Sequence, residues 1–290
     1  MSGLKQLRQR VKSIKSTQKV TKAMHIVSAA KLKKIKERAE ALNDYSAVLG
    51  DVMYEISNSM DTIKLSDNDR KFFSKGLVKL PRLLIVMTSE RGLCGSFNSS
   101  VIKKVKDDIN KLEKEGVEVK LLLVGKKGYN FFIRSAAEKI VDYYHVTNGN
   151  YECISREVKD RVISMVERGE VGSCYMYYNE FKNAMTQIMT IEQILPAKAM
   201  KEKNGQFIAE YEYEGSSLIH NVISLYIHGE INYGLLQSRA SEEGARMTSM
   251  DNATRNAGEL IDELTLKLNR SRQAIITTGL TEIISGAEAI

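Results

Sequence analysis

The sequence opens with LKQLRQRVKSIKSTQKVTKAMHIVSAAKLKKIK (residues 4–36), which carries eleven Lys or Arg and no Asp or Glu. No Gly or Pro stands between Gly3 and Gly50, so no strong helix breaker interrupts this stretch. Apolar residues recur every 3.5 residues when Leu4 is placed at heptad position a and Leu7 at position d. We therefore predict one long basic helix that pairs with another helix, about 69 Å long from Leu4 to Leu49.

The heptad pattern continues to Ile63, with thirteen apolar residues and no Lys or Arg at its eighteen a and d positions. It weakens from Gln18 to Ser28, where the a and d positions are polar. There the apolar residues move to another side of the helix, at Val20, Ala23, Met24 and Val27. The pattern leaves two interpretations open. One is a supercoil stutter against the same partner helix, and the other is contact with a different surface.

The C-terminal segment has the pattern expected of the partner helix. From Met247 onward, one a/d frame contains Met250, Ala257, Ile261, Leu264, Leu268 and Ile275, and Thr254, Ser271 and Thr278 fill its gaps. Residues 240–290 contain eight acidic and five basic residues, which partly complement the basic N-terminal helix. If the two ends of the chain pair as an antiparallel coiled coil, the middle of the sequence is an insertion between them.

The middle of the chain alternates strand and helix patterns. Leu83–Met87 is a continuous apolar run, typical of a strand buried on both faces. The patterns that follow it predict a helix to about Glu115, a strand at Val117–Val124, a helix at Gly128–Ala137, a strand at Ile140–Val146, a helix at Ile154–Glu167, and strands at Val171–Tyr178 and Ile188–Leu195. This alternation predicts a Rossmann-like α/β domain with an open, mostly parallel sheet. We expect coiled-coil helices at residues 1–75 and 210–290, and the α/β domain at 76–209.

The charge of the chain is concentrated at one end. The net charge is +7, but residues 1–36 contribute +11 and the remaining residues sum to −4. Nucleic acid, anionic lipid and an acidic protein surface are the candidate partners. The arm has no aromatic residue before Tyr45 on which bases could stack, and no Trp or Phe to anchor it in a membrane. These absences favour a protein partner.

The sequence shows no active site of its own. The segment Ser89–Asn98 follows a predicted strand and opens a helix, but it matches neither a P-loop nor a dinucleotide fingerprint, so a structural turn is the better interpretation. The three Cys and four His are scattered, without metal-ligand spacing. There is no secretory signal and no apolar run long enough to span a bilayer. We expect no catalytic residue, cofactor or metal.

Three segments resemble the gamma subunit family of the rotary F-type ATP synthase. Leu4–Leu32 resembles the N-terminal helix of the family, including Lys22-Ala23-Met24. ERGLCGSFN (Glu90–Asn98) is similar to its RGLCG turn. Ala245–Ala289, with ARMTSMDNATRNAGELIDELTLKLNRSRQA and ITTGLTEIISGAEA, is similar to its C-terminal helix. In one departure, Gly279 stands where the family usually has Glu.

This resemblance implies a fold and a set of partners. The terminal helices would form a central shaft inside the ring of alpha and beta subunits, and the α/β domain would contact the epsilon subunit and the c-subunit ring. The chain would not be an enzyme by itself. It would couple proton-driven rotation of the c ring to ATP synthesis or hydrolysis at beta, and so regulate ATPase activity and proton flow. The membrane would be contacted only through the complex.

The resemblance also implies site residues. Arg272, Gln273 and Thr277 would contact a beta loop, and Arg246 would play a related part. The turn Arg91, Gly92, Leu93, Cys94 and Gly95 would lie toward the epsilon subunit and the c ring. We further expect Val20, Met24 and Val27 to form a bearing contact, because a surface that turns against a stator must avoid deep knobs-into-holes interlocking.

Two other classes of function remain as alternatives: a small α/β enzyme with a coiled-coil oligomerisation arm, and a nucleic-acid-binding arm. For the leading interpretation we expect a peripheral protein on the cytoplasmic face of the bacterial inner membrane, or alternatively on the matrix side of the mitochondrial inner membrane. The family's chloroplast members carry an inserted, closely spaced regulatory Cys pair. No such pair occurs in this sequence.

Overall fold

The computed structural model describes residues 2–58, 67–73, 80–147, 149–197 and 216–288. The chain forms two compact units. Residues 1–29 and 246–290 make up the first, here called the coil unit. Residues 30–245 make up the second, here called the α/β unit. Two helices run through both units, α1 (Ser2–Asn58) and α6 (Ser216–Glu288).

The α/β unit is built on a five-stranded sheet in the order β3-β2-β1-β4-β5. The strands are β1 (Arg82–Met87), β2 (Val119–Val124), β3 (Ile140–Tyr144), β4 (Ser173–Phe181) and β5 (Gln187–Leu195). The first four are parallel, and β5 runs antiparallel to β4 at the edge. Central β1 is almost completely buried, as its unbroken apolar sequence predicts.

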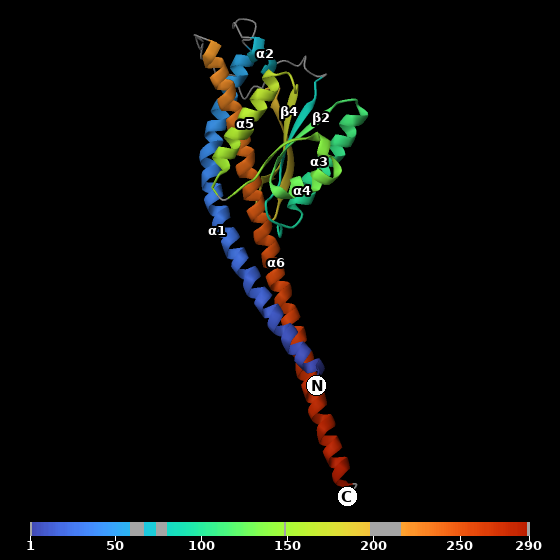
Figure 1. Cartoon of the computed structure of the whole chain (residues 1–290). Coiled ribbons are helices and arrows are strands. Elements are labelled where there is room, and N and C mark those ends of the chain that lie inside the picture. The colour runs from blue at the N-terminus through green and yellow to red at the C-terminus, as the bar shows by residue number, and fades with distance from the viewer. Residues whose placement is uncertain (1, 59–66, 74–79, 148, 198–215, 289–290) are drawn as a thin grey trace. The chain divides into compact units, whose positions relative to one another are not determined.

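Helices cover both faces of this sheet (Figure 1). Helices α3 (Phe97–Lys114) and α4 (Lys126–Ser135) pack on one face, around a core that includes Leu84, Val86 and Leu121. On the other face, α5 (Tyr151–Glu167), the short α2 (Asp67–Phe73) and α6 enclose a larger core. A 3-10 turn, η2 (Ala137–Lys139), leads into β3. The domain is therefore a three-layer α/β sandwich.

Helix α6 lies very close to the sheet. A Cβ atom on Gly234 would stand only 2.3 Å from the Cε of Met176, and one on Gly244 would stand 3.0 Å from the Phe181 ring. The two glycines therefore allow the helix to approach strand β4. On another side of α6, Leu32 and Ile35 of α1 pack with Leu236 and Ala240.

The coil unit is an antiparallel pair of helices. Near the start of α1, Leu4 and Leu7 line the same space as Ser271 and Ile275. Further along α1, the hydroxyl oxygens of Thr21 and Thr254 lie 2.7 Å apart. Residue numbers therefore increase along α1 while they decrease along the neighbouring part of α6, so the two helices are antiparallel. This confirms that the two ends of the chain pair.

The structure shows how Gln18–Ser28 packs against α6. Thr21 and Ser28 are buried, and the Gln18 side-chain amide donates to the Thr254 carbonyl at 3.4 Å. The a/d frame therefore continues here with polar residues, so the stutter is wrong. Val20 and Val27 are instead 56% and 53% exposed.

The predicted fold class is confirmed, and the elements differ mainly at their ends. Helix α5 begins at Tyr151, three residues before the predicted Ile154, because an apolar pattern does not include the first turn of a helix. Strand β4 continues to Phe181 instead of ending at Tyr178. Helix α2 was not predicted. The end of the predicted N-terminal heptad pattern, including Met60 and Ile63, lies outside the described residues.

Candidate functional site

The first candidate site is the crevice where strand order reverses. In open α/β sheets, ligands bind beyond the carboxyl ends of the strands at this reversal, here between β1 and β4. Phe97 lies beyond these strands and is only 2% exposed, and its carbonyl accepts a 2.8 Å hydrogen bond from the Asn179 side-chain amide. Cys94 and Phe97 also pack against Ala245 of α6. Protein side chains therefore fill this crevice.

The turn after β1 is closed by its own hydrogen bonds. The side chain of Asn98 accepts from the Ser89 backbone N–H at 2.9 Å and donates to the Ser89 hydroxyl at 2.7 Å. It also lies 3.2 Å from the Cys94 sulfur. Leu93 takes up a left-handed conformation with φ of 65°, a position that normally favours Gly. The turn is thus a rigid structural feature, as its sequence indicated.

The neighbouring start of α4 is also bound to protein. The backbone N–H of Gly128 donates to the Thr88 hydroxyl at 2.9 Å, and that of Lys127 donates to the Ser89 carbonyl at 3.0 Å. A Cβ atom on Gly125, where φ is 97°, would stand 2.0 Å from the Thr88 carbonyl oxygen. Amides at such a helix start bind phosphate in nucleotide-binding proteins. Here two of them bind the turn instead.

The outer part of the turn remains accessible. Arg91 and Leu93 are exposed. Glu90 anchors the turn by accepting from the Val146 backbone N–H at 2.7 Å and by facing His145 at 2.8 Å. Because Cys94 packs on Ala245, the last residue of the α/β unit, the turn lies where α6 leaves that unit.

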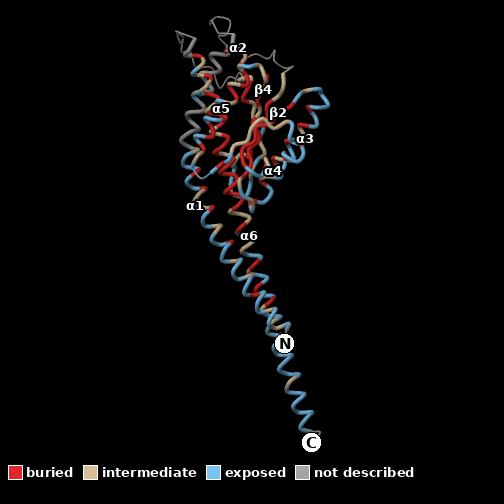
Figure 2. Tube along the Cα trace, in the orientation of Figure 1, coloured by how far each residue is buried: buried red, intermediate tan, exposed pale blue. Residues whose placement is uncertain are grey.

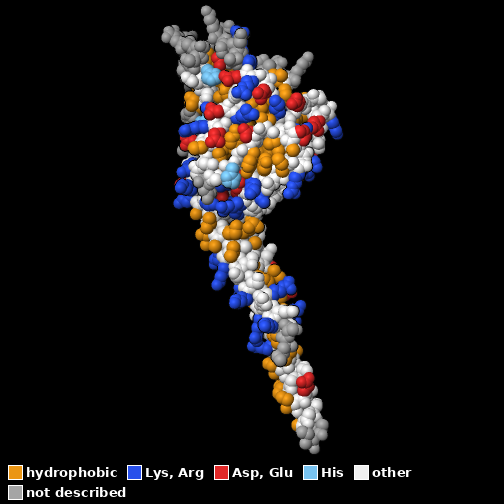
Figure 3. Space-filling view, viewed as in Figure 1, with side chains coloured by type: hydrophobic (Ala, Val, Ile, Leu, Met, Phe, Trp, Pro, Cys, Tyr) orange, Lys and Arg blue, Asp and Glu red, His pale blue; other side chains and the backbone are white. Residues whose placement is uncertain are grey.

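The predicted bearing residues share one face of α1. Val20, Met24 and Val27 are spaced four and three residues apart, which places them on one side of a helix. Val20 and Val27 are exposed and Met24 is half-buried. Neighbouring Ile26 is exposed as well. Figure 3 shows exposed hydrophobic side chains among the Lys and Arg side chains of the coil unit.

The predicted beta-contact residues do not all share one environment. Arg272, Gln273 and Thr277 are exposed on α6, and the Thr277 hydroxyl donates to the Gln273 carbonyl at 3.0 Å. Arg246, by contrast, is buried. Arg246 therefore lies in a different environment from the other three residues, and its part in the contact with beta stays a prediction.

An apolar tip on α6 was not predicted from the sequence. Ile276, Leu280, Ile283 and Ile284 are all exposed, Ile283 by 70%, near the end of the helix, where most of its residues are exposed (Figure 2). The pairing of the helices explains this exposure. The start of α1 lies beside Ser271–Ile275, so the later apolar residues of α6 have no more of α1 to pack against.

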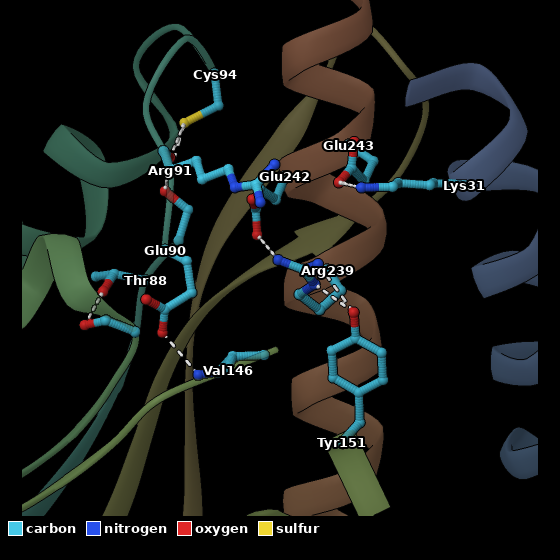
Figure 4. Close-up of polar contacts among 12 residues, drawn as sticks. Lys31, Thr88, Glu90, Arg91, Cys94, Val146, Tyr151, Arg239, Glu242 and Glu243 are labelled. Atoms are coloured by element: carbon cyan, nitrogen blue, oxygen red, sulfur yellow. Dashed lines mark hydrogen bonds and ion pairs between the residues drawn. The ribbon is translucent and has the colours of Figure 1, made fainter. Parts of the chain in front are cut away.

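A second missed feature is a buried charge cluster in the α/β unit (Figure 4). Arg239, Glu242 and Glu243 of α6 are all buried. Arg239 donates to the Tyr151 hydroxyl at 2.9 Å and to Glu242 at 2.5 Å, and Lys31 of α1 faces Glu243 at 3.9 Å. Burial alone would lower the pKa of Arg239, but Glu242 and the Tyr151 contact outweigh it and raise the pKa. The guanidinium therefore stays charged.

One Ser–His pair joins α5 to α6. The Ser155 hydroxyl lies 2.9 Å from His228 Nε2 and also lies 3.0 Å from the Glu152 carbonyl oxygen, to which it can donate. This polar contact connects the two helices. Within the described residues, no three His, Cys, Asp or Glu side chains gather as a metal site, and no helix is both long and apolar enough to span a membrane.

Fold and site define an α/β protein carried on two paired terminal helices, with its ligand crevice filled. Residues 3–290 match the family model described as ATP synthase. The chain is 53% identical to the ATP synthase gamma chain of Rickettsia felis and 52% identical to that of Rickettsia akari, each over the full length of both chains. This chain belongs to the ATP synthase gamma chain family.

Solved structures agree with this assignment. A chain of the mitochondrial ATP synthase central stalk and c ring of Tetrahymena thermophila aligns at 26% identity with a TM-score of 0.62, covering 81% of this chain and 99% of that one. A chain of the Euglena gracilis mitochondrial ATP synthase aligns with a TM-score of 0.70 over 99% of this chain and 94% of that one. At 17% identity, the second likeness shows the fold alone.

Proposed function

We propose that this chain is the central rotor shaft of an F-type ATP synthase. It couples proton-driven rotation of the c ring to ATP synthesis or hydrolysis at the beta subunits. The observation that carries the proposal is α6, a single helix of 73 residues that begins in the α/β unit and continues through the coil unit. At 1.5 Å per residue it extends about 110 Å. A continuous helix of this length can transmit torsion between distant partners.

The chain takes part in this reaction without catalysing it. Phe97, Cys94 and Ala245 occupy the crevice in which a related sheet would hold a nucleotide, and the α4 amides bind Thr88 and Ser89. Nucleotide chemistry therefore belongs to the alpha and beta subunits, and this chain needs no cofactor. The filled crevice also argues against the alternative of a small α/β enzyme.

The surface of the coil unit is suited to contact an acidic, partly apolar surface of the ring of alpha and beta subunits. Its twelve basic and six acidic residues account for +6 of the chain's +7. Exposed Arg272, Gln273 and Thr277 can meet polar groups of a beta loop, and charge complementarity favours that docking. Val20, Met24, Val27 and the apolar tip of α6 present smooth apolar surface to the ring. Such contacts hold a shaft without a fixed rotational register.

The α/β unit is proposed to contact the epsilon subunit and the c ring. The turn at Arg91–Gly95 packs through Cys94 on Ala245 of α6, and its Arg91 and Leu93 side chains are exposed. These exposed side chains are available for the contact with the epsilon subunit and the c ring that the sequence predicts.

The same proposal gives the location of the chain. The Rickettsia relatives favour the cytoplasmic face of a bacterial inner membrane, and the matrix face of the mitochondrial inner membrane is the alternative. In either case, the membrane is reached only through the rest of the complex.

Reconstitution tests the proposal. The purified chain is expected to hydrolyse no ATP and to protect no DNA. Added to alpha and beta subunits, it should give regulated ATPase activity, and with epsilon and the membrane sector in liposomes it should give ATP-driven proton pumping. Hydrolysis by the chain alone, or equal pumping without it, would refute the shaft.

A further inference from the structure

Helix α6 is enclosed on all sides over one short stretch of the α/β unit. From Gly234 to Ala245 every residue is buried except half-buried Gln237. This enclosure includes residues that normally face solvent: Ser238, Arg239, Ser241, Glu242 and Glu243. If the chain is a shaft, force must enter α6 from the α/β unit somewhere, and this stretch is where the unit encloses the helix.

Arg239 makes a directional connection between α6 and the α/β domain. Its Nε and Nη2 groups both donate to the Tyr151 hydroxyl, at 3.1 and 2.9 Å, while Nη1 donates to Glu242 at 2.5 Å. Tyr151 is the first residue of α5, which packs against the sheet. The planar guanidinium thus spans from α5 to the next turn of α6 in a fixed orientation (Figure 4).

Three other contacts meet the same stretch from different directions. Successive residues of a helix are rotated by about 100°. With Arg239 set at zero, Glu243 points to about 40°, Gly244 to about 140° and Ala245 to about 240°. Lys31 faces Glu243, the Phe181 ring lies against Gly244, and Cys94 with Phe97 packs on Ala245. Contacts therefore surround the helix axis, so α6 cannot rotate about this axis within the α/β unit without breaking one of them.

We propose that Tyr151, Arg239 and Glu242 form a torsional lock through which the α/β domain turns α6. These are positioning residues, and the inference rests on the proposed shaft function. Apolar packing is non-directional, whereas a forked, charge-assisted hydrogen bond fixes the orientation of its partners and so adds resistance to rotation about the helix axis. This explains why a buried position of α6 holds an arginine where Leu or Met would pack.

The lock predicts a change in stiffness, which can be measured in the complete complex. Cys153 is an exposed thiol two residues from Tyr151 and offers an attachment point for a rotation probe, in a complex without other reactive thiols. With the catalytic ring fixed to a surface and stalled, the angular variance of the probe reports torsional stiffness. The variants are Tyr151→Phe, which keeps the ring, and Arg239→Lys, which keeps the charge but not the fork. Arg156→Gln removes an exposed ion pair to Glu152 on the same helix and is the matched control.

We expect the angular variance to rise about twofold or more in Tyr151→Phe and Arg239→Lys. The rate of ATP hydrolysis in these variants, and the angular variance of the control, should stay near the parental values. Parental stiffness in a folded, assembled Tyr151→Phe complex would overturn the lock, whether or not Arg239→Lys assembles. A parental complex that does not rotate would instead refute the proposed function.

Discussion

Two stretches of α6 stand in opposite environments. Gly234–Ala245 is enclosed by the sheet, by α1, by α5 and by the turn after β1, whereas residues 280–287 are exposed throughout. The first stretch is held helical by packing, but the second depends on its own helix propensity and on whatever surrounds it in a complex. One helix thus combines an enclosed stretch with an exposed C-terminal end.

The two compact units also differ in net charge. The coil unit holds nearly all the net charge, while the basic and acidic residues of the α/β unit balance to +1. An exposed helix pair with a high positive charge is poorly suited to bury its own surface but well suited to meet an acidic collar. A net charge near zero is expected of a unit whose charged and polar side chains form hydrogen bonds and ion pairs with one another.

The largest expected effect on stability comes from replacing Arg239 in the enclosed stretch of α6, compared with replacing Arg272 in its exposed part. Arg239→Ala should lower the free energy of unfolding by about 3 kcal/mol, because it takes a cation from buried Glu242 and two donors from Tyr151. The double variant Arg272→Ala, Gln273→Ala should change it by less than about 0.5 kcal/mol, yet slow multisite ATP turnover in the complex. Urea unfolding and steady-state hydrolysis measure both. Equal stability losses would remove the distinction between the two stretches.

Matched glycine substitutions sharpen the comparison further. Gly244→Val should cost about 2 kcal/mol of unfolding free energy, because a Cβ there already stands 3.0 Å from Phe181 and 3.4 Å from the Ala184 Cα. Gly279→Ala should raise helix stability by about 0.5–1 kcal/mol, because nothing lies within 4 Å of the new methyl group. We expect thermal unfolding to show a lower midpoint temperature for Gly244→Val and a higher one for Gly279→Ala. Two losses of similar size would mean that the tip of α6 is as confined as the enclosed stretch.

The smallest expected effect is a pH dependence confined to the α/β unit. Burial lowers the pKa of His228, and Lys159 and Arg156 lower it further. The unfolded chain therefore binds a proton that the folded chain resists, and stability falls as the pH drops below the ordinary His pKa of about 6.5. As the pH is lowered from neutral to the pKa of His228 in the folded chain, the His228→Gln variant should lose less unfolding free energy than the parent. Parallel urea titrations at pH 7.5 and 5.5 test this, and identical losses would show that His228 contributes nothing.

Much of the fold was predictable from local patterns. The run Leu83–Met87 identified the central strand, and the absence of Gly and Pro after Gly3 identified α1, because these signals depend only on neighbouring residues. Element ends were less accurate, as the early start of α5 at Tyr151 illustrates. The site residues divided similarly. Arg272, Gln273 and Arg246 were grouped through their motifs, and the structure shows the first two exposed and Arg246 buried, because a motif carries no information on burial.

The sequence by itself determined that two periodic helices at the ends of this chain enclose an alternating α/β segment, since hydrophobic periodicity is a local property. Only the tertiary structure decided which polar residues lie inside. Arg239, Glu242 and Tyr151 look like ordinary surface residues in the sequence and become a buried cluster only when α5, α1 and the sheet converge on α6. Likewise, the apolar tip of α6 looks like a core segment in the sequence and remains exposed. Burial depends on which distant segments meet, and the period of a single helix does not contain that information.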